Sequence, residues 1–238
     1  MATLTQLRLI GLTSEGLDRF GDWLLDPDAL RAFLCLQRDA AQVGFDLQIA
    51  SAHRSFERQL AIWNQKLSGE RPVLDDNDCV VSLASMREED RIDCVLRYSA
   101  LPGASRHHWG SDIDVFDAAA VPPGYRIQLS QQEVAMDGPF AQLHAWLDER
   151  IITRESYGFY RPYDSDREGV APERWHLSYA PVAAHFAGRL RPQHLLEAWD
   201  LHTNLDPIQG RPSLDRRLDE LVERYVHRVA EVPVQIDF

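Results

Sequence analysis

The segment that most constrains the fold is residues 105–117, which read Ser-Arg-His-His-Trp-Gly-Ser-Asp-Ile-Asp-Val-Phe-Asp. His107 and Asp114 are seven residues apart, so they can share one metal ion if the chain turns between them. Gly110 lies between them and permits such a turn. Beyond the glycine, residues 111–116 alternate between apolar and polar side chains, as in a strand. The segment therefore predicts a turn followed by a strand that carries Asp114 on its polar face.

A second segment, residues 172–179, reads Pro-Glu-Arg-Trp-His-Leu-Ser-Tyr and alternates in the same way. We expect His176 to be the third metal ligand, because two histidines and one carboxylate leave a fourth position open, as in catalytic zinc sites. Glu173 precedes His176 by three residues, and on a regular strand this offset would place the two side chains on opposite faces. We therefore expect Glu173 in a bend before the strand, where it can reach a bound water without being a ligand.

These residues form the pattern Ser-x-His-x-x-Gly-x-x-x-Asp, from Ser105 to Asp114, followed by Glu-x-Trp-His. The pattern resembles that of the zinc D-alanyl-D-alanine carboxypeptidases, which include the vancomycin-resistance carboxypeptidases. That family shares a fold with lysostaphin-type peptidases and the hedgehog signalling domain. Two further pieces resemble the family in the same order: Ser-Ala-His-Arg-Ser-Phe-Glu-Arg-Gln at residues 51–59 and Tyr-Gly-Phe at residues 157–159.

The resemblance implies one zinc ion per chain, held by His107, Asp114 and His176, with Glu173 as the general base. It also implies that Arg54 polarises the scissile carbonyl and stabilises its oxyanion. The expected substrate-binding residues are Ser105 for the terminal carboxylate, Gln59 and Asp112. Plainer alternatives remain for three of these residues: an ion pair of Arg54 with Asp46 or Glu57, a turn hydroxyl at Ser105, and a surface salt bridge of Glu173 with Arg167 or Arg174.

Two positions differ from the family pattern. Asp112 stands where the family usually has a small residue, and His53 stands where it usually has an aromatic one. Asp112 could accept a hydrogen bond from a metal histidine or compete for the metal. His108 is a rival to His107 as a ligand, but the motif spacing selects His107.

The function implied is a zinc metallopeptidase that removes a C-terminal D-alanine from peptidoglycan-type peptides, as a D,D- or an L,D-carboxypeptidase. The expected partner is a peptidoglycan stem peptide or muropeptide. One alternative is a lysin-type endopeptidase, although the acidic chain lacks the basic wall-binding module that such lysins often carry. Another is a hedgehog-like zinc-bearing binding module, which would need neither Glu173 nor Arg54.

Composition narrows the partners further. The net charge of the 238-residue chain is −12, which disfavours nucleic acid and anionic membrane surfaces. No stretch approaches the ~20 apolar residues of a membrane span. Residues 1–12 show no charged start followed by an apolar run, so we expect no secretory signal, and the compartment stays unassigned.

The expected fold class is α+β: a small, mainly antiparallel sheet carries the zinc site and packs on helices, with a helical C-terminal extension. We expect a catalytic domain at residues 1–190 and an extension at residues 191–238, which packs on the core or mediates a homodimer. Residues 69–99 read as an excursion over the cleft rim or on the far side. The expected strands are 4–12, 45–52, 111–116, 157–160 and 176–179, and the expected helices begin near residues 14, 29, 55, 140, 181, 192 and 213.

Overall fold

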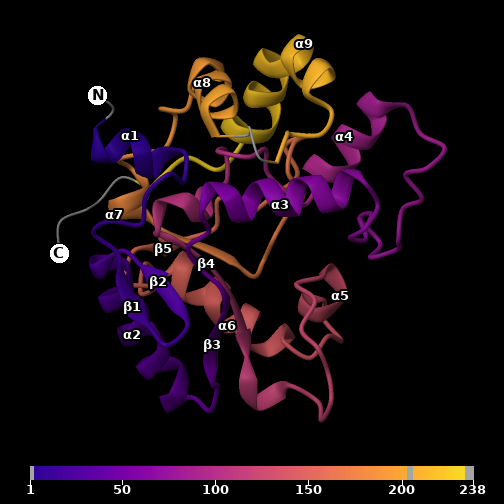
Figure 1. Cartoon of the computed structure of the whole chain (residues 1–238). Helices are drawn as coiled ribbons and strands as arrows, with labels where there is room; N and C mark the ends of the chain where they lie inside the picture. The colour runs from indigo at the N-terminus through magenta and orange to yellow at the C-terminus, as the bar shows by residue number, and fades with distance from the viewer. Residues whose placement is uncertain (1–2, 203–205, 234–238) are drawn as a thin grey trace.

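The computed structural model describes residues 3–202 and 206–233 and has an α+β architecture (Figure 1). One antiparallel sheet has the strand order β3-β4-β6-β5, and β1 and β2 form a separate hairpin. The predicted fold class is confirmed. The elements are α1 (Leu4–Leu9), β1 (Asp18–Phe20), β2 (Trp23–Leu25), α2 (Pro27–Gln42), β3 (Leu47–Ser51), α3 (Phe56–Leu67), α4 (Glu88–Leu96), η1 (Arg106–Trp109), β4 (Asp112–Asp117), η2 (Ala118–Ala120), α5 (Gln131–Val134), α6 (Ala141–Ile152), β5 (Phe159–Tyr160), β6 (His176–Tyr179), α7 (Ala180–Ala183), α8 (Pro192–His202), α9 (Arg211–Val222) and the π-helical turn η3 (Glu223–His227).

The four-stranded sheet has one apolar and one polar face, as the alternation predicts. Ile113, Val115 and Leu177 are fully buried in a core formed with α2 and α6. Because side chains alternate along a strand, Asp114 and His176 project from the opposite face. The two residues lie directly across from each other in the β4–β6 register. The apolar face therefore anchors a pair of potential ligands on the polar face.

Helix α2 begins and ends where its sequence signals predict. The Asp26 side chain accepts a hydrogen bond from the Asp28 backbone N–H, and Pro27 occupies the first turn. Gly44 follows the helix with a φ of +96°. The buried residues recur every three or four positions, which places one stripe of α2 against the sheet: Ala29, Ala32, Phe33, Leu36 and Ala40.

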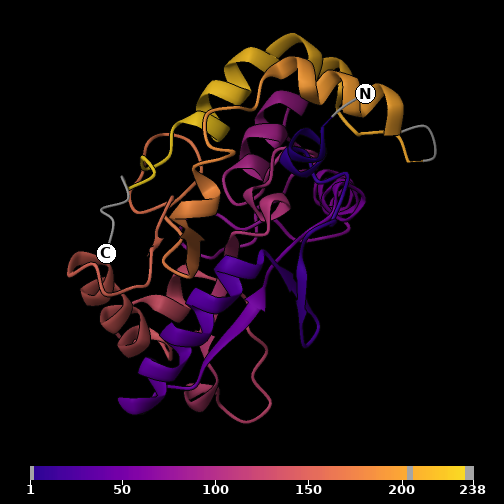
Figure 2. The ribbon, with the colours of Figure 1, turned by 90° about the vertical axis from the view of Figure 1, so that its left-hand side faces the viewer.

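Helix α3 covers the other side of the molecule and is capped by Ser55, whose side chain accepts from the Arg58 backbone N–H. Its apolar face lies in a second core that also contains side chains of α4, α8 and α9. Figures 1 and 2 show α8 and α9 lying over α3 and α4, away from α2. The polar face of the sheet thus lies between two hydrophobic cores.

The C-terminal helices pack on the chain's own core. The apolar stripe of α9 includes Leu214, Leu218 and Leu221, which are buried in the core shared with α3. This stripe is therefore covered within one chain, and a homodimer through α9 stays a prediction, as does the domain boundary at residue 190. Residues 203–205 and 234–238 of the predicted extension lie outside the described residues. Among the described helices, none is both long and apolar enough to cross a membrane.

Two predictions near the N-terminus are wrong. Residues 4–9 form helix α1 and not a strand, because Thr3 and Gln6 make a reciprocal capping box. The helix predicted from Ser14 is absent from the described structure, and the chain there enters the β1–β2 hairpin. The helix predicted over residues 181–190 is also shorter, since α7 ends at Ala183.

Candidate metal centre

A glycine turn presents His107 to the strand that carries Asp114. Helical turn η1 ends at Gly110, which has a left-handed φ of +74°. A Cβ atom at this position would lie 2.5 Å from a methyl group of Leu17 and 3.2 Å from the backbone nitrogen of Asp26. Glycine is therefore required here for both its conformation and its small size.

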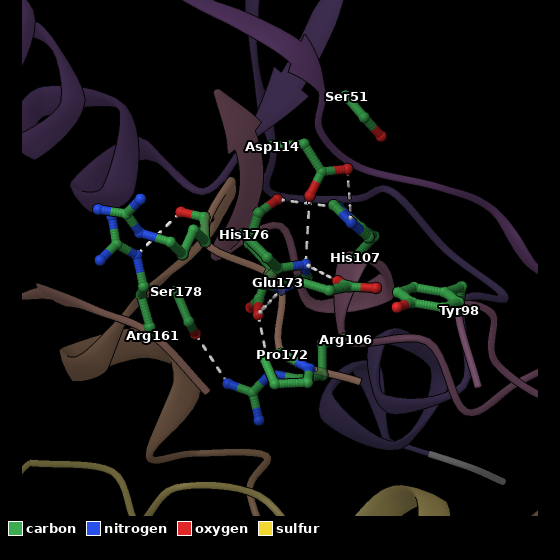
Figure 3. A network of polar contacts seen from close by, with 12 residues as sticks. Ser51, Tyr98, Arg106, His107, Asp114, Arg161, Pro172, Glu173, His176 and Ser178 are labelled. Carbon is green, nitrogen blue, oxygen red and sulfur yellow. Dashed lines mark hydrogen bonds and ion pairs between the residues drawn. The ribbon is translucent and has the colours of Figure 1, made fainter. Parts of the chain in front are cut away.

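The three predicted ligands converge on one point of the polar face (Figure 3). His107, Asp114 and His176 are buried, and one potential ligand atom from each lies within 4.8 Å of the others. His107 Nε2 is 3.3 Å from Asp114 Oδ2, and His176 Nδ1 is 3.2 Å from Asp114 Oδ1. His108 is not part of this group among the described residues, so the structure favours the motif spacing in choosing His107.

The hydrogen bonds behind the histidines determine which nitrogen faces the shared point. His107 Nδ1 is 3.2 Å from the carbonyl oxygen of Asp112, and a carbonyl can only accept, so Nδ1 carries the proton. His176 Nε2 lies 3.0 Å from the Asp112 carboxylate and donates to it when the ring is neutral. In both rings the remaining nitrogen then directs a lone pair at Asp114.

Lone pairs that face one another at this distance repel, and either a proton on a histidine or a metal cation between the groups relieves that repulsion. Asp114 Oδ1 is buried and accepts no hydrogen bond from the described residues. Although burial opposes charge on both groups, the surrounding carboxylates raise the pKa of His176 well above its ordinary value, and the two histidines lower the pKa of Asp114. Two nitrogens and one carboxylate oxygen match the donor set of a catalytic zinc site, so the residues present fit the metal.

Asp112 lies beneath the metal centre and away from the cleft. Its side chain is fully buried and meets three others: Arg106, Ser111 and His176. The expectation that Asp112 contacts substrate is therefore not supported by its position. The placement favours the alternative of an acceptor that holds a metal histidine.

The Asp112 carboxylate is balanced by a buried arginine. Arg106 Nε donates to Asp112 at 2.8 Å, and Arg106 Nη2 donates to Ser178 Oγ at 2.8 Å and to the Tyr160 hydroxyl at 2.9 Å. Burial alone would lower the pKa of Arg106, but the adjacent carboxylate raises it. Arg106 keeps its charge and fixes the Asp112 carboxylate that in turn orients His176. Sequence reasoning did not assign Arg106 a role, although it directly precedes His107 in the motif.

Glu173 lies in a bend before β6, as predicted. Its backbone N–H donates to the Tyr163 carbonyl, and its carbonyl accepts from the His176 N–H at 3.1 Å. The side chain is largely buried, and Oε2 lies 3.4 Å from His176 Nδ1. The carboxylate thus stands beside the ligand group, and Figure 3 shows it directed toward the same space. It forms no ion pair with Arg167 or Arg174 within the described chain.

Arg54 and Ser105 reach the cleft, and Gln59 does not. Arg54 donates its backbone N–H to the His107 carbonyl at 3.2 Å and its Nη1 to Gln59 Oε1 at 2.8 Å. Gln59 is fully buried and donates to the Ala100 carbonyl at 2.6 Å. Its position favours a role in holding Arg54 and not direct contact with substrate. Arg54 forms no ion pair in the part of the chain that the structure describes.

His108 and His53, the two histidines of the motif segments that are not candidate ligands, are packed against other residues. His108 Nδ1 lies 2.6 Å from the Arg54 carbonyl, and its ring fills the space beside Gly11. Burial lowers the pKa of His108 to about 3 and the pKa of His53 to about 4. These lowered pKa values favour neutral rings at ordinary pH, and the His108 ring supports the segment that carries Arg54.

A cleft of about 820 Å³ opens over these groups. Its walls include the three ligands, Glu173, Arg54 and Ser105. Parts of residues 71–80 and 98–101 form the rim, so the excursion at residues 69–99 lies at the cleft and not on the far side. The volume is sufficient for several residues of a peptide, since pockets for small ligands span roughly 300–1,000 Å³.

Comparisons with known proteins agree with this geometry. The family model VanY, described as D-alanyl-D-alanine carboxypeptidase, matches residues 22–182. An uncharacterized protein of Haemophilus influenzae is 30% identical over 128 residues, which cover 53% of this chain and 92% of that protein. A second match to an uncharacterized protein of the same organism is 46% identical over 77 residues, or 32% of this chain and 53% of the relative.

Solved structures that share the fold include two vancomycin-resistance proteins. A mutant of the vancomycin-resistance D,D-pentapeptidase VanY from a VanB-type resistance cassette, in complex with Zn(II), is 21% identical with a TM-score of 0.50. The match covers 71% of this chain and 80% of that structure. VanYB in complex with D-alanine-D-alanine is 20% identical with a TM-score of 0.50, over 71% of this chain and 79% of that structure.

Proposed function

Because the chain belongs to the VanY family of D-alanyl-D-alanine carboxypeptidases, we propose that it is a zinc-dependent carboxypeptidase that removes a C-terminal D-alanine from peptidoglycan-type peptides. The resemblance seen in the sequence motifs is confirmed by the family match over residues 22–182. One observation carries the proposal: the Asp114 carboxylate faces one nitrogen from each of His107 and His176. The Glu173 carboxylate lies beside this group.

The metal would be held by His107, Asp114 and His176. When bound there, zinc supplies a Lewis acid that activates water and polarises a carbonyl group. Glu173 stands at the position for proton transfer: it takes a proton from the attacking water and returns it to the leaving amine. Since the Glu173 carboxylate is beside the ligands and makes no ion pair with an arginine or lysine among the described residues, it is free for this task.

Arg54 is positioned to stabilise the negative charge that develops on the scissile carbonyl oxygen. Its guanidinium is held by Gln59 and lines the cleft together with Asp114 and Glu173. A preorganised cation in a largely buried site stabilises an oxyanion more strongly than it would in water. We assign Ser105 to the terminal carboxylate of the substrate, because its side chain lines the same cleft next to His107.

The proposed peptide class is supported by the family match and by a ligand of a neighbouring structure. VanYB is described in complex with D-alanine-D-alanine, and we extend a ligand of this kind to the present cleft. Arg54 and Glu173 both face the cleft, which favours an enzyme over a binding module that needs the metal alone.

Digestion of purified muropeptides by the zinc-loaded protein tests the proposal. We expect mass spectrometry to detect the loss of one C-terminal alanine. Shortening of pentapeptide stems indicates D,D cleavage, and shortening of tetrapeptide stems indicates L,D cleavage. Cleavage inside cross-linked stems would indicate an endopeptidase and not a carboxypeptidase. Unchanged muropeptides, with zinc occupancy confirmed by elemental analysis, would contradict the peptidase function and favour the binding module.

A further inference from the structure

One wall of the cleft is strongly basic. Arg58 and Lys66 lie on α3, with Ile62 between them at helical spacing, and all three line the cleft. Arg71 joins them from the segment after α3, and Arg126 joins from the segment before α5. Three separate parts of the chain thus bring cationic side chains to one surface, beyond the Arg54 already assigned to the reaction.

These cations lack carboxylate partners. Within residues 3–202 and 206–233, no Asp or Glu oxygen lies within 4.0 Å of the charged nitrogens of Arg58, Lys66, Arg71 or Arg126, whereas Arg97 pairs with two aspartates. The chain has 37 acidic and 25 basic residues besides its histidines, so acidic partners are not scarce. An unpaired basic wall in an acidic protein indicates that the compensating charge comes from outside the chain.

The acidic residues that line the cleft form no ion pair with this wall within the described residues, although the charge of Glu173 acts against the lowering of the Lys66 pKa. Asp114 and Glu173 belong to the metal centre. Asp78 also lines the cleft, but its carboxylate oxygens accept the backbone N–H groups of Gln131 and Gln132. Apart from Asp78, the acidic side chains that line the cleft therefore belong to the metal centre and not to the wall.

The cations also act on one another. Burial, followed by the charges of Arg58 and Arg126, lowers the pKa of Arg71. Burial, followed by the charge of Arg71, lowers the pKa of Lys66 to about 8. A bound anion would oppose both effects, because an opposite charge favours the protonated form.

We propose that this wall is a subsite for carboxylate groups of an acidic peptide, bound beyond the residues that flank the scissile bond. This inference rests on the proposed function, because the bound peptide is the substrate of that reaction. The preference for carboxylate groups is argued from the arrangement of the cations. Arg58 and Lys66 are eight residues apart on α3, or about 12 Å along the helix axis. Cations distributed over that length match acidic groups spaced along an extended chain better than one compact anion such as phosphate.

The test compares two pentapeptides that both end in D-alanyl-D-alanine. One contains two glutamates among its first three residues, and the other contains two glutamines at the same positions. Their affinities are measured by calorimetry on the zinc-loaded protein that carries Glu173→Gln, so that turnover does not consume the peptide. The measured quantity is the ratio of the two affinities, which isolates the charge from the rest of the peptide.

We expect the acidic peptide to bind on the order of tenfold more tightly, since partly exposed ion pairs each contribute about two- to fivefold. The ratio should fall towards one in the triple variant Arg58→Gln, Arg71→Gln, Arg126→Gln, and each single variant should lower it in part. It should also fall as salt is raised, because exposed charges are screened. Arg19→Gln is the matched control: this exposed arginine on β1 makes no ion pair within the described chain and does not line the cleft, so the ratio should stay at the wild-type value.

An affinity ratio near one in the protein with its basic wall intact would contradict the proposed subsite. An affinity ratio in the triple variant as high as that with the wall intact would also contradict it. The proposed function is tested separately by cleavage with the wild-type protein. Equal cleavage of both peptides with a ratio near one would remove the subsite and leave the carboxypeptidase. A high ratio without cleavage of either peptide would leave an acidic-peptide site and remove the carboxypeptidase.

Discussion

Asp112 connects the two histidines proposed as ligands to the rest of the fold. Its backbone carbonyl faces His107 Nδ1, and its carboxylate faces His176 Nε2, so one residue directs both rings. The sequence predicts Asp112 on the same strand face as Asp114, which the structure confirms. Its burial and its pairing with Arg106 could not be predicted, because they depend on how η1 folds back against β4.

We predict that Asp112→Asn weakens zinc binding by about 10–100-fold, as expected when a group that orients a ligand is lost. The zinc-free protein should also lose roughly 3–5 kcal/mol in free energy of unfolding, because Arg106 would remain buried without its partner charge. Chelator competition measures the first effect, and urea unfolding measures the second.

Asp117→Asn is the control for this prediction. Asp117 is a buried carboxylate on the same strand, but its Oδ1 accepts only backbone N–H groups, from Asp46 and Ala119. An asparagine can accept the same bonds, so zinc affinity should stay within about twofold of wild type. Wild-type zinc affinity in Asp112→Asn would show that Asp112 does not orient His176.

At the scale of elements, the sequence predicts those segments whose periodicity and caps agree. Helices α2 and α3 and strands β3, β4 and β6 follow this rule. Strands β4 and β6 carry Asp114 and His176, whereas His107 lies on η1. The strand expected over residues 4–12 is wrong because the leucine and isoleucine residues at 4, 7, 9 and 10 suit a helix as well as a strand, and the capping box at Thr3 and Gln6 favours the helix. The β1–β2 hairpin has only three residues in each strand, too few for a period to appear.

The turn between η1 and β4 can be tested through Gly110. We predict that Gly110→Ala destabilises the protein by more than Gly124→Ala, although the two glycines have φ values of +74° and +75°. Both substitutions cost about 1–2 kcal/mol for the left-handed conformation. Only Gly110→Ala also crowds Leu17 and the Asp26 backbone, since nothing lies within 4 Å of a Cβ at Gly124.

Thermal or urea unfolding of the zinc-free variants measures this difference, and Gly110→Ala should also lower zinc affinity by displacing His107. Equal losses of stability in the two variants, with normal zinc affinity, would mean that the turn tolerates a side chain and does not set the position of His107.

At the scale of the whole molecule, two cores enclose one polar layer. The α2–α6 core holds the back of the sheet, and the core of α3, α4, α8 and α9 holds the opposite side of the cleft. The sequence predicts the amphipathic stripe of α9 but not its partner, since an apolar stripe fits a second chain as well as its own. The shared core implies that the C-terminal helices and the cleft wall are stabilised together.

We therefore predict that Leu221→Ala, at a fully buried position of α9, lowers the free energy of unfolding by roughly 2–5 kcal/mol in one cooperative transition. Leu201→Ala on α8 is the control, because Leu201 is 70% exposed and the loss should be within about 0.5 kcal/mol. Urea unfolding followed by both circular dichroism and tryptophan fluorescence measures these values. Two separate transitions would instead support an independent extension at residues 191–238.

The role of Glu173 is tested by measuring the turnover and the zinc content of Glu173→Gln in the same sample. Glutamine keeps the shape of the side chain beside His176 but cannot take a proton. We predict wild-type zinc occupancy, retained binding of a peptide with a free C-terminus, and turnover lower by at least about 10²–10⁴-fold. His176→Ala should differ by losing the zinc itself, since it removes a ligand.

Glu168→Gln provides the matched control, because Glu168 lies in the exposed segment before β6 and its side chain is 85% exposed. Its turnover should equal that of the wild type. If Glu173 is the general base, the turnover of Glu173→Gln should fall while zinc stays bound. Near-normal turnover in Glu173→Gln, with one zinc per chain confirmed, would contradict the assignment of Glu173 as the general base.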